Sequence, residues 1–336
     1  WHQDAHVVYV DQPFGVGFSR IPEQTKVENE TQVGEYVYKF LVNFFKVFPK
    51  LQTKEIYLGG ESYAGFYVSY IAKYLLDVND SKGIFINDPV LDQYWRQIPS
   101  STLAYFAEQN LLNSTAQETL QRQYNKCLPL YQSKKSSEAT GTDYFNGTGE
   151  CDIQVIAYSD VRESTNPCFF EYDIRENCQT NPPPQQPLNL EPINYTEYFQ
   201  DPRVRKALHV PEEVSPWDVC VSGILDPVDP SLVPVNILPS INERGVKILI
   251  WTGDKDAILN HIGIEWSIGN LTWAGATGFL ENVTRPICDA KNQVVGKIQT
   301  ERNLTYILIH NAGHFLTADQ QEVSRMVLRN VVFDDP

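Results

Sequence analysis

The sequence predicts an α/β protein with a mostly parallel sheet that is interrupted by a long insertion. Strand-sized apolar runs alternate with segments whose apolar residues recur at helical spacing, over residues 30–86 and again over residues 246–331. This alternation is typical of a parallel sheet covered by helices. We therefore expect a core formed by residues 1–92 and 233–336, with residues 93–232 inserted as a cap region.

The N-terminal part of the predicted core alternates strand and helix. A short apolar run at residues 6–10 is strand-like. Residues 30–48 carry apolar and aromatic side chains at helical spacing, and a proline follows them. A second strand (55–58), a second helix (66–76) and a third strand (82–86) come next. The chain is therefore expected to enter the sheet three times before the insertion begins.

The insertion breaks this pattern. Helical spacing is found at residues 101–112 and 202–208, but the segment from 126 to 187 is irregular and holds four of the six cysteines. That segment keeps many aromatic residues, which a flexible linker would lack. We therefore expect a disulfide-pinned cap.

The sheet pattern returns in the C-terminal part of the chain. A buried strand is expected at residues 246–251 and a helix at 262–267. A last strand follows at 304–309 and a last helix at 319–331. Both strands are followed by polar residues, which are candidates for a functional site.

The charge of the chain excludes two classes of partner. The sequence has 27 Lys and Arg against 42 Asp and Glu, a formal net charge of −15. Such a surface repels nucleic acids and anionic membranes. No apolar run reaches the roughly 18 residues that a membrane span needs. We expect neither a nucleic acid partner nor a membrane span.

Asparagine and cysteine indicate the secretory pathway. Eight acceptor sequons for N-glycosylation occur together with six cysteines, a combination that favours an oxidising compartment. The candidate glycosylation sites are Asn29, Asn79, Asn113, Asn146, Asn194, Asn270, Asn282 and Asn303.

A serine lies in a tight turn between a predicted strand and a predicted helix. The turn reads Gly-Gly-Glu-Ser-Tyr-Ala-Gly over residues 59–65. Gly60 and Ala64, two residues either side of Ser62, allow strand and helix to approach closely. This is the context of a nucleophile elbow, although the pattern is G-x-S-x-A in place of the commoner G-x-S-x-G. The alternative is a tight turn whose serine only caps the helix.

Two further polar residues follow buried strands. Asp256 comes after the strand at 246–251, and His314 after the strand at 304–309. The carboxyl ends of parallel strands share one edge, so Ser62, Asp256 and His314 are expected to meet there. Their chain order is that of the α/β-hydrolases. In this chemistry the serine attacks an acyl carbon, the histidine moves its proton and the aspartate orients the imidazole. Singly, the histidine or the aspartate has an ordinary structural explanation; the three together do not.

Longer motifs resemble those of the serine carboxypeptidases, and the similarity runs nearly end to end. Glu-Ser-Tyr-Ala-Gly, with Asp-Gln-Pro upstream, is highly specific for this family. The resemblance implies an α/β-hydrolase core and a secreted, fungal-type member. The motifs lie at residues 10–19, 60–65, 201–210, 253–256 and 312–314.

The resemblance also implies roles for individual residues. It selects Asp256, the second aspartate of Gly-Asp-x-Asp, as the catalytic one, and it assigns an oxyanion-hole donor to the backbone N–H of Tyr63. It implies that Glu61 helps to bind the terminal carboxylate of the substrate. Two carboxylates repel unless one is protonated, so binding should weaken as the pH rises. The alternative for Glu61 is an ordinary buried glutamate. Neither a metal nor an organic cofactor is expected, because no metal-ligand spacing is found.

The start of the sequence departs from the family pattern. The chain opens at Trp1, close to a strand-like run, and lacks an Asn-Gly-Gly-Pro-Gly-Cys-Ser-Ser-like motif. In the family that segment supplies a second oxyanion donor and further carboxylate-binding groups. Losing one donor costs on the order of a hundredfold in rate. We expect that the family's N-terminal segment belongs to the same precursor as this chain. It is either a separate chain, left out of this sequence, or truly lost in a divergent homologue.

The six cysteines allow 15 connectivities. A disulfide between Cys168 and Cys178 would close a short loop. A second disulfide, between Cys127 and Cys151, is a hypothesis. The resemblance implies that Cys220 pairs with a cysteine of the upstream segment, which leaves Cys288 over. Alternatively, Cys220 pairs with Cys288.

The predicted function is a serine-type carboxypeptidase that removes C-terminal amino acids from peptides or proteins at acidic pH. The expected location is outside the cell or in a vacuole- or lysosome-like compartment. One alternative is a family member turned to acyltransferase, esterase or hydroxynitrile lyase chemistry, but Glu61 would have no use there. Another is a non-catalytic fragment without its oxyanion segment, against which the intact triad argues.

Overall fold

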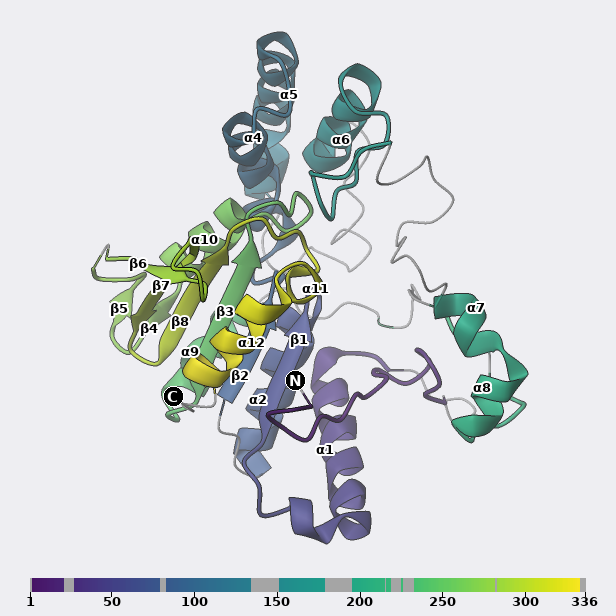
Figure 1. Cartoon of the computed structure of the whole chain (residues 1–336). Helices are drawn as coiled ribbons and strands as arrows, with labels where there is room; N and C mark the ends of the chain where they lie inside the picture. Colours follow the sequence, from purple (N-terminus) through teal and green to yellow (C-terminus); the bar gives the residue numbers. More distant parts are fainter. Residues whose placement is uncertain are drawn as a thin grey trace.

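A twisted sheet runs through the centre of the protein (Figure 1). The computed structural model describes residues 2–20, 27–78, 83–133, 151–178, 195–214, 216–218, 225, 233–281 and 283–332. Within these ranges the main sheet has six strands in the order β1-β2-β3-β8-β7-β6. The first four are parallel, and β7 and β6 add antiparallel strands at one edge. The strands are β1 (Tyr57–Glu61), β2 (Gly83–Asn87), β3 (Lys247–Gly253), β8 (Leu304–Ile309), β7 (Val294–Glu301) and β6 (Arg285–Cys288).

The central strands are apolar because both faces of the sheet are covered. Every residue of β2 and β8 is buried, and β3 exposes only Lys247. Alternate residues pack to opposite sides, as strand geometry requires. Phe85, Leu249 and Ile307 belong to the cluster that includes α12 (Gln321–Val327) and the π-helical turn after it. Ile84 and Ile248 belong to the larger cluster on the other face.

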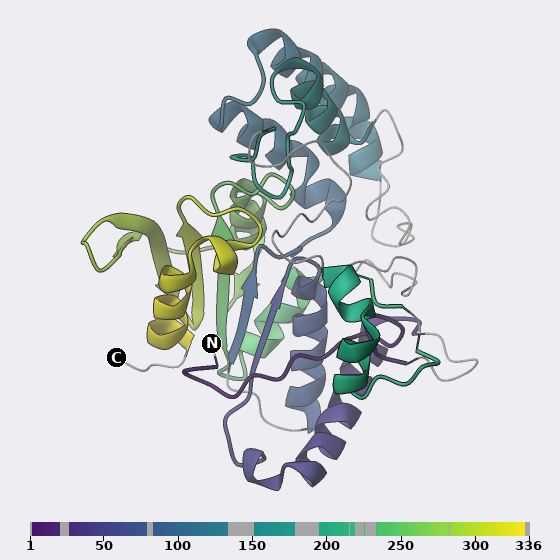
Figure 2. The ribbon, with the colours of Figure 1, turned by 45° about the vertical axis from the view of Figure 1, so that its right-hand side comes forward.

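The larger cluster is covered by helices from both halves of the chain. The helices α2 (Ala64–Val78), α9 (Pro234–Asn242) and α10 (His261–Asn270) contribute to it. Outside them, α1 (Glu30–Val47) packs against α2 through a third cluster that includes Val33 and Ile71. In Figure 2 the sheet is seen between α12 on one side and α2 on the other.

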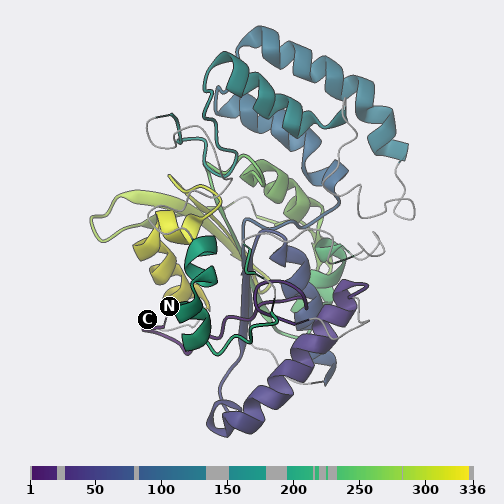
Figure 3. The same cartoon turned by 90° about the vertical axis from the view of Figure 1, so that its right-hand side faces the viewer.

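The longer helices described within residues 93–232 and two shorter ones form two groups. The first group, α4 (Pro99–Glu108), α5 (Ser114–Ser133) and α6 (Ile153–Ser164), lies beyond the carboxyl ends of the strands (Figure 3). The second group, α7 (Tyr195–Gln200) and α8 (Pro202–Ala207), lies beside residues 2–20, where Phe199 packs edge-on against Phe18. Tyr105 and Phe106 of α4 are buried in the same cluster as the sheet, so the first group shares the core. The short elements are α3 (Tyr94–Gln97), α11 (Leu316–Asp319), β4 (Thr272–Trp273) and β5 (Ala276–Thr277).

Several predicted elements match closely, and others were wrong or missed. The helix predicted at 30–48 is α1, and the strand predicted at 304–309 is β8. The strand predicted at residues 6–10 is wrong: this segment has no regular structure, and Tyr9 is 85% exposed. β6 and β7 were missed because their apolar and polar residues do not form a strand-like run.

Candidate active site

The parallel strands bring the predicted site residues to one edge of the sheet. Register pairs Glu61 with Asn87, Asn87 with Trp251 and Gly253 with Ile309, so four strands end almost level. Chain segments that follow these ends therefore lie next to one another. The site below is built from the four segments that leave β1, β2, β3 and β8.

Ser62 occupies a strained turn directly after β1. Its φ is +63°, a left-handed conformation that costs energy for a residue with a side chain. The Ser62 N–H donates to the carbonyl of Asn87 at 3.0 Å, and its own carbonyl accepts from Gly65 and Val90 N–H at 3.0 and 3.1 Å. The backbone is therefore held on both sides, as a nucleophile elbow requires.

Small residues around the elbow allow the close approach. A Cβ on Gly60 would lie 2.4 Å from the Cβ of Ala64, and a Cβ on Gly65 would lie 2.1 Å from the carbonyl oxygen of Val90. Both distances are far below van der Waals contact. Glycine at these two positions is thus needed for strand, helix and the β2 loop to meet.

His314 and Asp256 form a buried hydrogen-bonded pair. The distance from His314 Nδ1 to Asp256 Oδ2 is 2.7 Å, and the two side chains are 2% and 0% exposed. Asp256 Oδ1 accepts from the N–H groups of Ile258 and Leu259 at 2.8 and 3.2 Å. The other candidate, Asp254, accepts instead from the N–H of Asn311 at 2.8 Å. The geometry therefore favours Asp256 as the partner of His314. In the described ranges no hydrogen bond joins Ser62 to His314.

The carboxylates around His314 make it a stronger base. Burial lowers the pKa of the His314 imidazole, but the charge of Asp256, its hydrogen bond and the more distant Glu61 outweigh burial. The net effect is a raised pKa. A buried imidazole that is stabilised in its charged form suits a group that must hold a proton during a reaction.

A loop of the predicted cap supports this pair. The His314 N–H donates to the carbonyl of Tyr172 at 2.7 Å, and the Tyr172 ring packs edge-on against the imidazole with 5.2 Å between ring centroids. The carbonyl of Glu171 accepts from the N–H groups of Ala257 and Ile258, both at 3.0 Å. Residues 171 and 172 thus contact the loops of both Asp256 and His314. No feature of the sequence singled them out.

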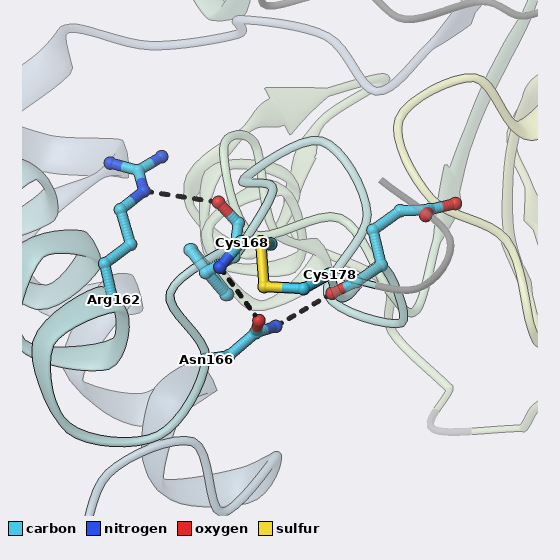
Figure 4. Close-up of a disulfide and its surroundings, with 6 residues drawn as sticks. Arg162, Asn166, Cys168 and Cys178 are labelled. Atoms are coloured by element: carbon cyan, nitrogen blue, oxygen red, sulfur yellow. Dashed lines mark hydrogen bonds between the residues drawn. A yellow bond between two sulfur atoms is a disulfide. The ribbon is translucent and has the colours of Figure 1, made fainter. Parts of the chain in front are cut away.

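The loop is closed by a disulfide. Cys168 and Cys178 are bonded, and the amide of Asn166 bridges the loop ends by accepting from Cys168 N–H at 3.1 Å and donating to the Glu176 carbonyl at 2.8 Å (Figure 4). Arg162 Nε donates to the carbonyl of Phe169 at 3.2 Å and so ties the loop to α6. These contacts hold the segment that carries Tyr172 in a defined position.

Glu61 is the last residue of β1 and lies beside the pair. Its carboxylate accepts a hydrogen bond from the Asn87 side chain. Burial raises the pKa of Glu61, and the charge of Asp256 adds to this, while His314 and Asn87 oppose it. The net direction is upward, so Glu61 retains a proton to higher pH than an exposed glutamate.

Tyr63 is fixed by a buried carboxylate on α1. Its hydroxyl donates to Glu30 Oε1 at 2.7 Å, and Glu30 is 2% exposed. The Tyr63 ring stacks on Phe66 with centroids 5.0 Å apart. Glu30 was not singled out from the sequence; in the structure it is the first residue of α1, after Asn29, whose side chain caps the helix. This contact links the residue after the elbow serine to the start of α1.

Asp88 is a further acidic residue at the site that the sequence did not single out. Asp88, Asp256 and His314 each offer one atom, and these atoms lie within 4.8 Å of one another. A small cation could be held at such distances, but both oxygens of Asp256 already accept hydrogen bonds from protein groups. The arrangement suits proton transfer better than metal binding.

The remaining predicted residues divide between described and undescribed parts. Disulfides join Cys127 to Cys151 and Cys168 to Cys178, the two pairs favoured by the sequence. Cys288 has a free thiol, which argues against its pairing with Cys220; Cys220 itself lies outside the described residues. Of the sequon asparagines, Asn113, Asn270 and Asn303 are exposed and Asn29 is half-buried. Asn79, Asn146, Asn194 and Asn282 lie outside the described residues. Across the described helices, none is long and apolar enough to cross a bilayer.

The sequence of the chain is similar to those of known proteins. A family model described as serine carboxypeptidase matches residues 1–334. The pheromone-processing carboxypeptidase kex1 of Aspergillus oryzae is 32% identical over 98% of this chain and 54% of its own length. The pheromone-processing carboxypeptidase KEX1 of Coccidioides posadasii is also 32% identical, over 98% of this chain and 53% of its own length. The chain thus spans about half the length of the curated relatives it matches.

The fold resembles a solved carboxypeptidase structure. The crystal structure of Kex1(delta)p, a prohormone-processing carboxypeptidase from Saccharomyces cerevisiae, matches with a TM-score of 0.79 and 26% sequence identity. The match covers 96% of this chain and 73% of that one. Together with the family match, it confirms the predicted α/β-hydrolase core and the resemblance to fungal serine carboxypeptidases.

Proposed function

Because this chain belongs to the serine carboxypeptidase family, we propose that it contributes the catalytic residues of a serine-type carboxypeptidase. The observation that carries the proposal is the 2.7 Å bond between buried His314 and Asp256 at the sheet edge where Ser62 occupies its strained turn. The substrate is a peptide or protein with a free C-terminus, and the product is that substrate shortened by one residue.

In the proposed reaction Ser62 Oγ attacks the last peptide carbonyl. His314 Nε2 accepts the serine proton, while Asp256 stabilises the imidazolium through Nδ1. The oxygen of the tetrahedral intermediate takes a hydrogen bond from the backbone N–H of Tyr63. His314 then protonates the leaving amine, so that the C-terminal amino acid departs and an ester remains on Ser62. Water, activated by His314, hydrolyses that ester.

Glu61 is proposed to bind the C-terminal carboxylate of the substrate. Its raised pKa supports this role, because a protonated glutamate can donate a hydrogen bond to a carboxylate that an ionised one would repel. Because Glu61 must be protonated for this role, activity should be greatest at acidic pH.

The reaction as written needs neither a metal nor a cofactor.

Further parts of the proposal concern the whole protein. The core is assigned to residues 1–92 and 233–336 and the cap to residues 93–232. An N-terminal segment of the same precursor is proposed to supply a second oxyanion donor. Two disulfides and exposed sequon asparagines support passage through the secretory pathway, with an acidic, vacuole-like or extracellular destination.

The test is release of the C-terminal amino acid from an N-blocked dipeptide at about pH 5, near the expected working range. The parent protein is compared with Ser62→Ala. Release that disappears in the variant supports the proposal. If the parent acts on esters or cyanohydrins but releases no amino acid, the chain is a family member with other chemistry. If it modifies none of these substrates, the proposal is wrong for this chain.

A further inference from the structure

A third carboxyl group, that of Asp88, lies beside the catalytic pair but takes no part in the steps above. Asp88 follows the last residue of β2 and is fully buried. Its φ is +41°, so the backbone adopts a left-handed conformation at a residue that carries a side chain. Its N–H donates to the carbonyl of Trp251 in β3 at 2.9 Å. The turn thus directs this residue between the ends of β2 and β3.

The two oxygens of Asp88 differ in their surroundings. Oδ1 accepts from the N–H of Gly253 at 3.0 Å, which ties β2 to the end of β3. Oδ2 is buried and, among the residues described, has no hydrogen-bond partner. An ionised Asp88 would therefore bury a negatively charged oxygen that has no well-formed hydrogen bond, and the Thr252 hydroxyl is a weak substitute, so ionisation is unfavourable. A protonated Asp88 carries its hydrogen on that oxygen instead.

Asp256 is the better site for the negative charge. Its oxygens accept from Ile258 N–H, Leu259 N–H and His314 Nδ1. Asp88 lies within 4.8 Å of Asp256 and His314, and two buried carboxylates this close cannot both ionise easily. One proton shared between them therefore belongs to Asp88.

The groups that face Asp88 come from every neighbouring strand. Glu61 approaches from β1, Asp256 and Thr252 from the β3 side, and His314 from the segment after β8. Burial, followed by the charge of Asp256, raises the pKa of Asp88 well above its usual range, and Glu61 adds to this, while hydrogen bonds from the Gly253 N–H and the Thr252 hydroxyl oppose it without reversing it. The direction agrees with the hydrogen-bond geometry.

We propose that Asp88 is a positioning residue that stays neutral while the enzyme works, so that a single negative charge stabilises the His314 imidazolium. When the pH rises enough to ionise Asp88, a second negative charge appears beside His314. His314 then holds its proton more tightly once it has accepted it, and returns that proton less readily to the leaving group. The ionisation of Asp88 therefore lowers kcat/KM at alkaline pH, whether or not the substrate has a free carboxylate. This inference rests on the proposed function.

The test compares Asp88→Asn with the parent protein on an N-blocked amino-acid ethyl ester. Asparagine keeps an oxygen for the Gly253 N–H and cannot ionise, and this ester has no carboxylate for Glu61 to repel. The ratio kcat/KM is measured across the pH range and scaled to the maximum of each protein. We expect the acid limb to stay in place and the alkaline limb to move upward by about one pH unit or more, since a neighbouring charge shifts a pKa by such amounts.

Two results would overturn the proposal. Superimposed profiles would mean that Asp88 only braces β2 against β3. An acid limb that moves to lower pH would mean that Asp88 is already ionised in the acidic range. Asp92→Asn, a buried aspartate four residues along the same segment, is the matched control and should leave both limbs in place.

A second readout does not depend on activity. Infrared difference spectra between acidic and alkaline pH should contain the carbonyl band of a buried protonated carboxylic acid that is lost in Asp88→Asn. If neither protein hydrolyses the ester, the proposed function fails, while the infrared band still decides whether Asp88 is protonated. A band that is the same in both proteins would refute the assignment.

Discussion

Glu61→Gln isolates the effect of the substrate carboxylate on the pH dependence. Glutamine has the shape of a protonated glutamate and keeps an oxygen to accept the Asn87 amide. It cannot ionise, so its N–H groups donate to a carboxylate at any pH. The variant should bind a free-acid substrate at acidic pH nearly as the parent does.

The magnitude follows from the protonated fraction of Glu61. Burial raises its pKa, but above that pKa each pH unit lowers the protonated fraction tenfold. The parent should therefore lose up to about tenfold in kcat/KM per pH unit, equivalent to about 1.4 kcal/mol of binding free energy. Glu61→Gln should not show this slope. The two curves should cross, and the variant should be the better enzyme at alkaline pH.

The assay uses two N-blocked dipeptides that differ only at the C-terminus, one a free acid and one a carboxamide. The ratio of their kcat/KM values cancels effects on His314 and Asp88, which act on both substrates. In the parent this ratio should fall as the pH rises, and in Glu61→Gln it should be flat. A ratio that falls equally in both proteins would refute the role of Glu61 in carboxylate binding.

Three further predictions concern stability and can be measured by urea unfolding. Tyr63→Phe leaves buried Glu30 without its donor and should lower the free energy of unfolding by about 1–3 kcal/mol, whereas Glu30→Gln keeps an acceptor and should cost less; equal losses would contradict this. Replacing both Cys127 and Cys151 with alanine opens a cross-link between residues 24 positions apart and should cost roughly 3 kcal/mol, and no loss would show that the bond does not form. Asp88 has a raised pKa in the folded state, so unfolding releases its proton, and the free energy of unfolding of the parent falls as the pH rises above about 3.9. Asp88→Asn, which cannot ionise, should therefore gain stability relative to the parent between about pH 4 and 7. A stability difference that stays constant over this range would refute the prediction.

The sheet could be predicted because its strands are short, apolar and separated by helical patterns. β8 was predicted at its true bounds, since every residue from Leu304 to Ile309 is buried. Ser62, Asp256 and His314 could be proposed because each lies in the loop that follows such a strand. The parallel register then requires no further information to bring the strand ends together.

The residues that were missed are those whose role depends on contacts far along the chain. Asp88 precedes a proline, and a sequence cannot distinguish a turn-forming aspartate from one directed into a buried site. Tyr172 reaches His314 from a loop 142 positions earlier, and nothing local in either segment signals that contact. The strand prediction at residues 6–10 was wrong because local composition was misleading. The β-branched residues of this segment suit a strand, but the segment does not pair with the sheet.

The pairing of β2 with β3 determines when this protein can act. Glu61, Ser62 and Asp88 come from the first third of the chain, whereas Asp256 and His314 come from the last, and that pairing joins the two groups across the whole insertion. A nascent chain therefore carries no assembled site until its C-terminal strands have been synthesised and have docked. Because such distant pairings form late in folding, the proposed activity would appear only after the whole chain has been synthesised.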